Sequence, residues 1–290
     1  MPAPAAASLQ QQFPFEPRFM HFRGMRIHYV DEGPREAPVL LCCHGFPAWS
    51  FLFRQQLCDL RAGWRVVAFD LPGFGCSEGP DENECHLELI GALLALLGID
   101  QFNLLAHGTG VMLGCELAAE MPGRLLAACL VSGSATSRPM QGSPWHDWLC
   151  ERARDGRLEA LFEDLDTLLP GLVQRLGVGA GWTPAPASLT AYVRVFRAAP
   201  ARTAALRLIE RTCLVPEADL PRPTDVPALL IHGSRDQTLD TVAAEHELGA
   251  IFPNHRCVRL PGVGHFVPEE AGDLLSSLLA AFLNSPGSGR

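Results

Sequence analysis

Short apolar runs of strand length alternate with helix-period segments along most of this chain, and this alternation limits its possible folds more than any other feature. The runs expected to form strands are residues 25–30, 38–43, 64–71, 102–106, 125–131, 226–232 and 256–260. Two helical segments carry an apolar stripe, formed by Ile90, Leu93, Leu94 and Leu97 and by Leu274, Leu275, Leu278, Leu279 and Phe282. The alternation predicts an α/β fold with a mostly parallel central sheet and helices on both faces.

The alternation stops over residues 132–223. This stretch has helical patterns at 148–169 and 189–212 and no convincing strand. We therefore expect residues 1–131 and 224–290 to form an α/β core, with residues 132–223 inserted between two of its strands as a helical cap.

Charge and composition exclude several classes of function. The 23 basic and 32 acidic residues give a formal net charge of −9, so we expect no nucleic-acid partner and no membrane partner. A chain that is 48% hydrophobic and 19% charged can bury a sizeable core and is not disordered. The oligomeric state cannot be inferred from these properties.

Cysteine usage and the N-terminal segment favour a cytoplasmic protein. Half of the 10 cysteines lie inside apolar runs, where a thiol acts as a small hydrophobic group. There is no C-x-x-C pair and no Cys/His cluster with zinc spacing. The first sixteen residues have neither a basic start nor an apolar stretch typical of a signal peptide. We expect no metal site and no cofactor.

A first candidate site follows the strand expected at residues 38–43. The segment His44-Gly45-Phe46-Pro47 lies where open α/β sheets place their functional sites, at the carboxyl end of a strand. A glycine here lets the next backbone N–H face a ligand, so the N–H of Phe46 is a candidate oxyanion donor.

A second and a third site follow other strands. Residues 106–110 have small residues two before and two after Gly108, as a sharp strand–turn–helix requires. Asp236 and His265 each follow a later strand, so Asp236 is expected to orient His265 as a general base. Thr109 is expected to turn its hydroxyl away and to offer its N–H to the oxyanion site. The order elbow, acid, histidine is that of α/β-hydrolases.

From about residue 22 to about residue 283 the chain resembles the α/β-hydrolase fold. The segments IHYVDEGP (27–34), HGFPAWSFLFR (44–54) and DLPGFGCSEGP (70–80) are most similar to its haloalkane dehalogenase and epoxide hydrolase branch. The resemblance implies an α/β-hydrolase core with the helical cap inserted after the sixth core strand.

The chain departs from this branch at the residues that carry its chemistry. The resemblance implies an aspartate at the elbow, or a serine in esterases and lipases, but Gly108 has no side chain and cannot be a covalent nucleophile. Thr109 stands where dehalogenases have a tryptophan, and Phe46 where they often have a second halide donor. Epoxide hydrolases use two cap tyrosines, whereas only Tyr192 lies in the expected cap, with His146 as its one candidate companion.

Three hypotheses follow. We favour an enzyme, a hydrolase in which His265 and Asp236 act as a general base without a covalent intermediate on a small to medium apolar molecule. The second is a catalytically inactive binding module, and the third is a haloalkane dehalogenase or epoxide hydrolase whose nucleophile has been substituted at residue 108. In each case the cap is expected to close over His265. The residues expected to contact the substrate are His44, His107, Trp145, Trp148 and Tyr192, with Trp182 as a further candidate.

Overall fold

The computed structural model describes residues 9–79, 85–162, 183–214 and 219–285. Their centre is an eight-stranded sheet in the order β1-β2-β4-β3-β5-β6-β7-β8. The strands are β1 (Arg18–Phe22), β2 (Met25–Glu32), β3 (Val39–Cys43), β4 (Arg65–Phe69), β5 (Phe102–His107), β6 (Leu125–Val131), β7 (Ala228–Gly233) and β8 (His255–Leu260). Six of them, from β4 to β8 across the sheet, run parallel, while β1 and β2 are antiparallel.

All seven predicted strands are present, and β1 is the strand that the sequence patterns did not reveal. Every residue of β3, β4, β5 and β7 is buried, as expected for apolar strands covered on both faces. By contrast, β1 has the sequence RFMHF and buries only Met20. Its two polar side chains and single buried residue hide it from a search for apolar runs.

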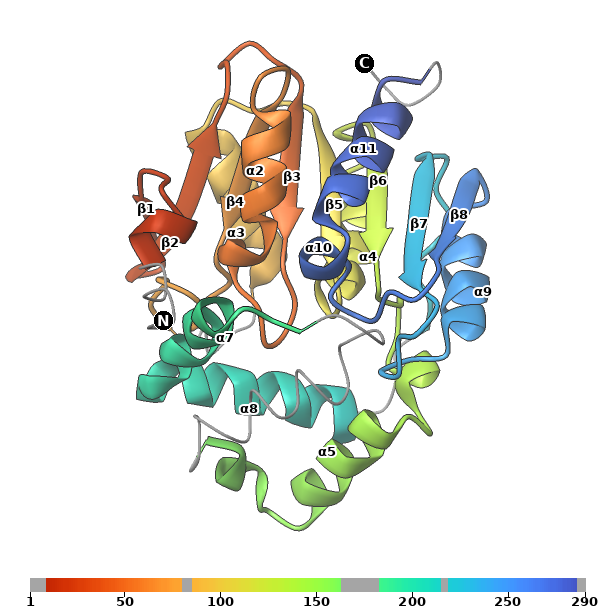
Figure 1. Ribbon diagram of the computed structural model, residues 1–290. Helices are drawn as coiled ribbons and strands as arrows, with labels where there is room; N and C mark the ends of the chain where they lie inside the picture. The colour runs from red at the N-terminus through yellow and green to blue at the C-terminus, as the bar shows by residue number, and fades with distance from the viewer. Residues whose placement is uncertain (1–8, 80–84, 163–182, 215–218, 286–290) are drawn as a thin grey trace, which may run out of the picture.

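Helices cover both faces of this sheet. Figure 1 shows α2 (Arg54–Leu60) and α11 (Gly272–Leu283) in front of the sheet and α3 (His86–Leu96) and α4 (Gly110–Glu120) behind it. The remaining helices of the core are α1 (Leu9–Gln12), α9 (Thr241–Ile251) and α10 (Val267–Glu270). The apolar stripe predicted on α11 is only partly correct, because Leu274 is 47% exposed and the buried face holds Leu275, Leu279 and Phe282.

Where the structure describes it, the segment between β6 and β7 consists of helices joined by turns and loops, without a strand. It contains α5 (Pro144–Arg154), α7 (Pro186–Val193) and α8 (Ala199–Leu214), with 3-10 turns at Arg138–Met140, Leu158–Phe162 and Arg194–Arg197. Ser143 caps α5, since its hydroxyl accepts the backbone N–H of His146. In Figure 1 these helices lie beyond the arrowheads of β3, β6 and β7. The part of the predicted helix 148–169 that follows Phe162 lies outside the described residues.

A buried polar cluster joins these helices to the core. Glu269 of α10 accepts hydrogen bonds from both Arg54 of α2, at 2.7 Å for the longer one, and Tyr192 of α7, at 2.5 Å. The indole N–H of Trp49 also donates to the carbonyl oxygen of Ala191, at 3.1 Å. These contacts hold α7 against the carboxyl end of the sheet.

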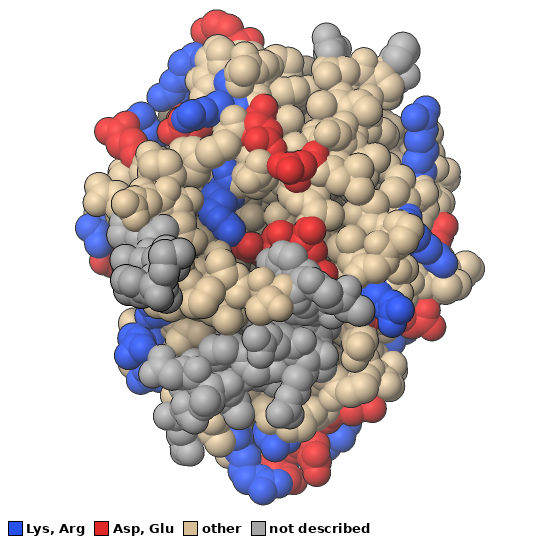
Figure 2. Space-filling model, in the orientation of Figure 1, with Lys and Arg blue, Asp and Glu red and all other residues tan. Residues whose placement is uncertain are grey.

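The surface has mixed charge. On the face shown in Figure 2, basic and acidic side chains are interspersed among uncharged ones, and the described residues form no continuous basic surface there. Among the described residues, no helix has the length and apolarity needed to cross a bilayer.

Candidate active site

Two loops meet at the carboxyl ends of β3 and β5. Gly108, between β5 and α4, has a φ of +59°, a left-handed conformation that glycine adopts without strain. The loops approach so closely that a Cβ on Gly45 would lie 2.5 Å from the backbone nitrogen of Thr109, and one on Gly110 would lie 2.6 Å from the carbonyl oxygen of His44. The glycines at 45 and 110 therefore allow the sharp strand–turn–helix predicted from the sequence.

The loops after β7 and β8 bring Asp236 and His265 together. The Nδ1 atom of His265 lies 2.9 Å from Oδ2 of Asp236, and Asp236 is completely buried. Because an ionised carboxylate can only accept, Nδ1 carries the proton and Nε2 keeps its lone pair. Thr238 donates its hydroxyl to Oδ1 of Asp236 at 2.7 Å and lies 2.9 Å from Nδ1. The sequence contained no signal for this third residue.

The environment keeps Asp236 ionised. Burial by itself raises the pKa of this carboxyl group. The adjacent His265 and the hydrogen bonds from His265 and Thr238 lower it by more than burial raises it, so the pKa of Asp236 is below its usual value. An ionised Asp236 stabilises the imidazolium that forms when Nε2 accepts a proton.

The free nitrogen of His265 faces the elbow. A Cβ placed on Gly108 would lie 3.5 Å from Nε2, which is ordinary van der Waals contact. Thus a side chain at position 108 would contact His265, and the glycine leaves that space free of a side chain.

The predicted oxyanion donor already has a partner. The N–H of Phe46 donates to the hydroxyl oxygen of Thr109, at 3.1 Å. The expectation that the Thr109 hydroxyl points away is therefore wrong, since it lies against the oxyanion loop. A hydroxyl that accepts from Phe46 still has its own proton to donate, so Thr109 can offer a hydrogen bond to a ligand.

A cavity of about 60 Å³ lies between these loops and the helices after β6. The core contributes polar groups, among them Thr109, Thr238 and His265, whereas α5 and α8 contribute mainly apolar side chains. The lining residues from α5 and α8 are Trp145, His146, Leu149, Leu208, Ile209, Thr212 and Cys213. Such a wall suits a small to medium apolar ligand.

Two histidines expected to contact substrate are fully buried outside this cavity, and that expectation is corrected. Nε2 of His44 accepts the N–H of Leu71 at 3.0 Å, so His44 joins two loops of the core. Nε2 of His107 donates to the carbonyl oxygen of His265 at 3.0 Å, so His107 fixes the backbone of His265. Burial, followed by the charge of His265, lowers the pKa of His107 to about 3, which keeps it neutral.

Of three aromatic residues expected to contact substrate, one lines the cavity and two do not. Trp145 lines the cavity and stacks on Phe46 with ring centroids 6.4 Å apart. Trp148 stacks behind Trp145, at 6.1 Å, and does not line the cavity. Tyr192 is 4% exposed, and its hydroxyl is bound to Glu269, so its expected contact with substrate is also corrected. Trp182 lies outside the described residues.

Among the described residues, two groups of side chains have the atoms to hold a metal ion. His28, Asp70 and Cys76 form one group, but the carboxylate of Asp70 is already saturated by His28 and by the N–H groups of Ser50 and Cys76. His146, Cys150 and Cys213 form the other, and the search for zinc spacing in the sequence missed it.

Comparisons with known proteins agree with this fold. Residues 38–271 match the family model described as alpha/beta hydrolase fold. Haloalkane dehalogenase 2 of Mycobacterium tuberculosis is 29% identical over 290 aligned residues, which cover 93% of this chain and 95% of the relative. An epoxide hydrolase from Vigna radiata has a TM-score of 0.76 at 24% identity, covering 96% of this chain and 99% of that one.

A membrane phospholipase A, described as a bacterial virulence factor, has a similar fold. Its TM-score is 0.77 at 23% identity, and the match covers 94% of this chain and 87% of that one. At these identities the solved structures support the fold alone, because one fold hosts many chemistries.

Proposed function

Because the chain belongs to the alpha/beta hydrolase fold family, we propose that it is a hydrolase that uses His265 and Asp236 as a general base and forms no covalent enzyme intermediate. The observation that carries this proposal is the placement of Nε2 of His265 beside a glycine, 3.5 Å from where a Cβ would lie. Water is the nucleophile that fits this space.

In the proposed reaction Nε2 of His265 removes a proton from a water molecule as its oxygen bonds to the electrophilic carbon of the substrate. Asp236, hydrogen-bonded to Nδ1, stabilises the imidazolium. The hydroxyl of Thr109, held by the N–H of Phe46, donates to the oxygen that gains negative charge. In an ester or an epoxide the leaving oxygen then takes the proton from His265, which restores the neutral base. A halide leaves as an anion, and the proton then passes from His265 to solvent.

The substrate class follows from the cavity and the relatives. The wall formed by α5 and α8 is mainly apolar, and the relatives include haloalkane dehalogenases and an epoxide hydrolase. We therefore propose a small to medium uncharged molecule with an electrophilic carbon, in the order ester, epoxide, haloalkane. Esters come first because their hydrolysis needs an oxyanion donor, which Thr109 supplies.

The main test compares turnover of an activated aryl ester, styrene oxide and 1-bromohexane by the parent protein and by His265→Ala. General-base catalysis contributes about 10²–10⁴-fold, so kcat should fall by that factor for the substrate that is turned over. His246→Ala is the matched control, because His246 is exposed on α9 and does not line the cavity. No turnover of any substrate by the parent would contradict the proposal and favour the binding module.

A second test distinguishes attack by water from a covalent route. In a single turnover in H₂¹⁸O, direct attack places ¹⁸O in the first product molecule. Gly108→Asp introduces a carboxylate, and a covalent route through it would place ordinary ¹⁶O in that product. If Gly108→Asp or Gly108→Ser exceeds the parent in turnover, the glycine is a substituted nucleophile and the third hypothesis is correct.

A further inference from the structure

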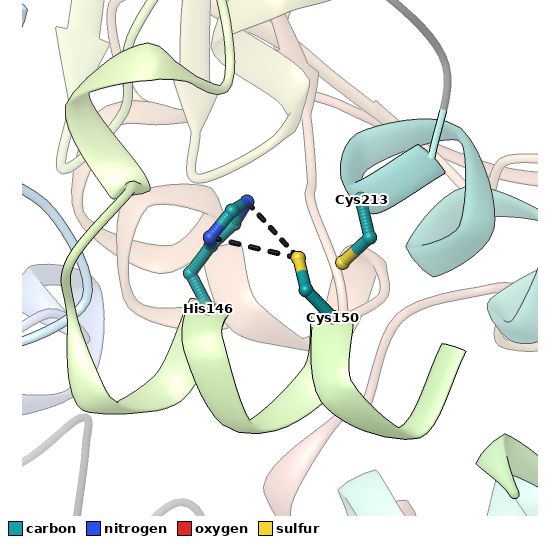
Figure 3. A group of neighbouring side chains, drawn as sticks. All are labelled: His146, Cys150 and Cys213. Atoms are coloured by element: carbon teal, nitrogen blue, oxygen red, sulfur yellow. Dashed lines mark hydrogen bonds between the residues drawn. The ribbon is translucent and has the colours of Figure 1, made fainter. Parts of the chain in front are cut away.

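Three side chains with soft-metal ligand atoms meet between α5 and α8. His146 and Cys150 are four residues apart on α5 and so share one face of that helix, and Cys213 comes from the last turn of α8. Figure 3 shows the three side chains pointing into the same space. Their ligand atoms all lie within 4.8 Å of one another.

The spacing is close to that of a metal site. Nε2 of His146 is 3.4 Å from Sγ of Cys150, and Nδ1 is 3.6 Å from it. Zinc bond lengths of about 2.3 Å to sulfur and about 2.0 Å to nitrogen put tetrahedral ligand atoms about 3.5–3.8 Å apart. Small side-chain rotations therefore suffice to bring the three atoms around one ion.

The surroundings favour one nitrogen of His146 as the ligand. Nδ1 lies 3.7 Å from a carboxylate oxygen of Asp147, which leaves Nε2, the nitrogen nearer to Cys150, for the metal. A carboxylate behind a ligating histidine is the usual arrangement in zinc proteins, because it fixes the tautomer and raises the basicity of the ring. His146 is 8% exposed and Cys150 is 2% exposed, so both are shielded from bulk water.

The group also borders the cavity that contains the proposed general base. His146 and Cys213 both line it, as does His265. Three protein ligands leave the fourth tetrahedral position open, which is typical of zinc sites that bind water or substrate rather than purely structural ones.

We propose that His146, Cys150 and Cys213 form a binding site for one soft divalent cation, Zn²⁺, whose fourth position opens toward the cavity. Binding converts the two thiols to thiolates, so two protons are released for each ion bound and no electrons are transferred. The ion joins α5 to α8. This inference does not depend on the proposed hydrolysis, because it concerns metal binding alone.

The test is a titration of the reduced, metal-stripped full chain with Co²⁺ as a spectroscopic probe, followed by Zn²⁺. One Co²⁺ per chain should give thiolate-to-cobalt charge-transfer absorption and the intense d–d bands of a tetrahedral site, and Zn²⁺ should remove both. Cys150→Ser and Cys213→Ser should each weaken binding at least tenfold and reduce the charge-transfer absorption. His146→Ala should weaken binding to a similar degree and alter mainly the d–d bands.

Cys58→Ser is the matched control, because Cys58 is an exposed thiol on α2, and it should leave the titration unchanged. Alkylation followed by mass spectrometry covers the case in which a variant does not fold. In the parent protein Zn²⁺ should protect Cys150 and Cys213 at least tenfold, and should not protect Cys58. Absence of charge-transfer absorption, or equal alkylation of Cys150 and Cys213 with and without Zn²⁺, would overturn the site.

Discussion

The two sides of the cavity are built differently. On the core side, residues such as His265, Asp236 and Thr109 are held by hydrogen bonds of 2.7–3.1 Å to loops at strand ends. On the cap side, Trp145 and Leu149 are held by stacking and by apolar packing. Hydrogen bonds fix the orientation of a polar side chain, whereas apolar packing fixes the size and shape of the space beside it. We therefore propose that the core side sets the reaction and that the cap side sets which molecules fit.

Among the changes that test this difference between the two sides, a substitution of Thr109 on the core side is expected to have the largest effect on kcat. Thr109→Val keeps the shape but removes the hydroxyl, so kcat should fall by about 10²–10³-fold, the typical cost of losing an oxyanion donor. Thr109→Ser keeps the hydroxyl and should stay within about tenfold of the parent. Steady-state kinetics on the best substrate measures both.

A matched change on the cap side sharpens this result. Leu149→Ala removes apolar lining without a polar group, so it should raise KM and leave kcat within a few-fold of the parent. Unchanged or faster turnover by Thr109→Val would contradict the role of the hydroxyl and would assign the oxyanion donor to the freed N–H of Phe46.

The second effect is the loss of stability in acid. Burial lowers the pKa of His107 to about 3 and that of His232 to about 4, whereas an unfolded histidine titrates near 6.5. The unfolded chain therefore binds more protons below pH 6.5, so stability is full above that pH and declines as the pH falls toward 4. Each pKa unit corresponds to about 1.4 kcal/mol, so His232 alone accounts for about 3 kcal/mol.

Chemical denaturation at pH 7 and pH 5 measures this decline. His232→Leu should reduce the difference between the two pH values, because both ring nitrogens of His232 have no hydrogen-bond partner among the described residues. His246→Ala, at an exposed site, should leave the difference as in the parent. Asp236 contributes only at lower pH, because its depressed pKa protects the folded state until the pH falls below about 4. An unchanged difference in His232→Leu would refute this assignment.

The smallest effect concerns the junction between cap and core. Tyr192→Phe removes the hydrogen bond to Glu269 but leaves the two from Arg54, so the free energy of unfolding should fall by about 1–2 kcal/mol. Because Tyr192 does not line the cavity, kcat should stay as in the parent. A loss of kcat without a loss of stability would show that Tyr192 contacts the substrate after all.

The difference between the two sides of the cavity also explains which features of the fold and the site the sequence could predict. Continuous apolar runs identified β3, β5 and β7, because a strand covered on both faces consists mainly of apolar residues. The small residues on either side of Gly108 predicted the sharp turn there, and the order of Gly108, Asp236 and His265 predicted that these three residues would meet. These features depend on local backbone geometry, which leaves a trace in neighbouring residues.

Features that depend on tertiary packing left no such trace. Thr238 lies beside His265 only because β7 and β8 are adjacent. His44 and His107 follow strands as functional residues do, yet both turn inward and bond to the backbone. Cys213 lies 63 residues after Cys150 in the chain, and only the packing of α5 on α8 brings them together.

The elbow glycine makes the centre of this protein open to chemical rescue. The space beside Nε2 of His265 accepts an atom at 3.5 Å without a clash, and formate is a carboxylate that carries no backbone with it. A solution carboxylate bound there would serve as a diffusible nucleophile. Turnover that rises and then saturates with formate concentration would identify this chain as an enzyme whose missing functional group can be supplied from the buffer.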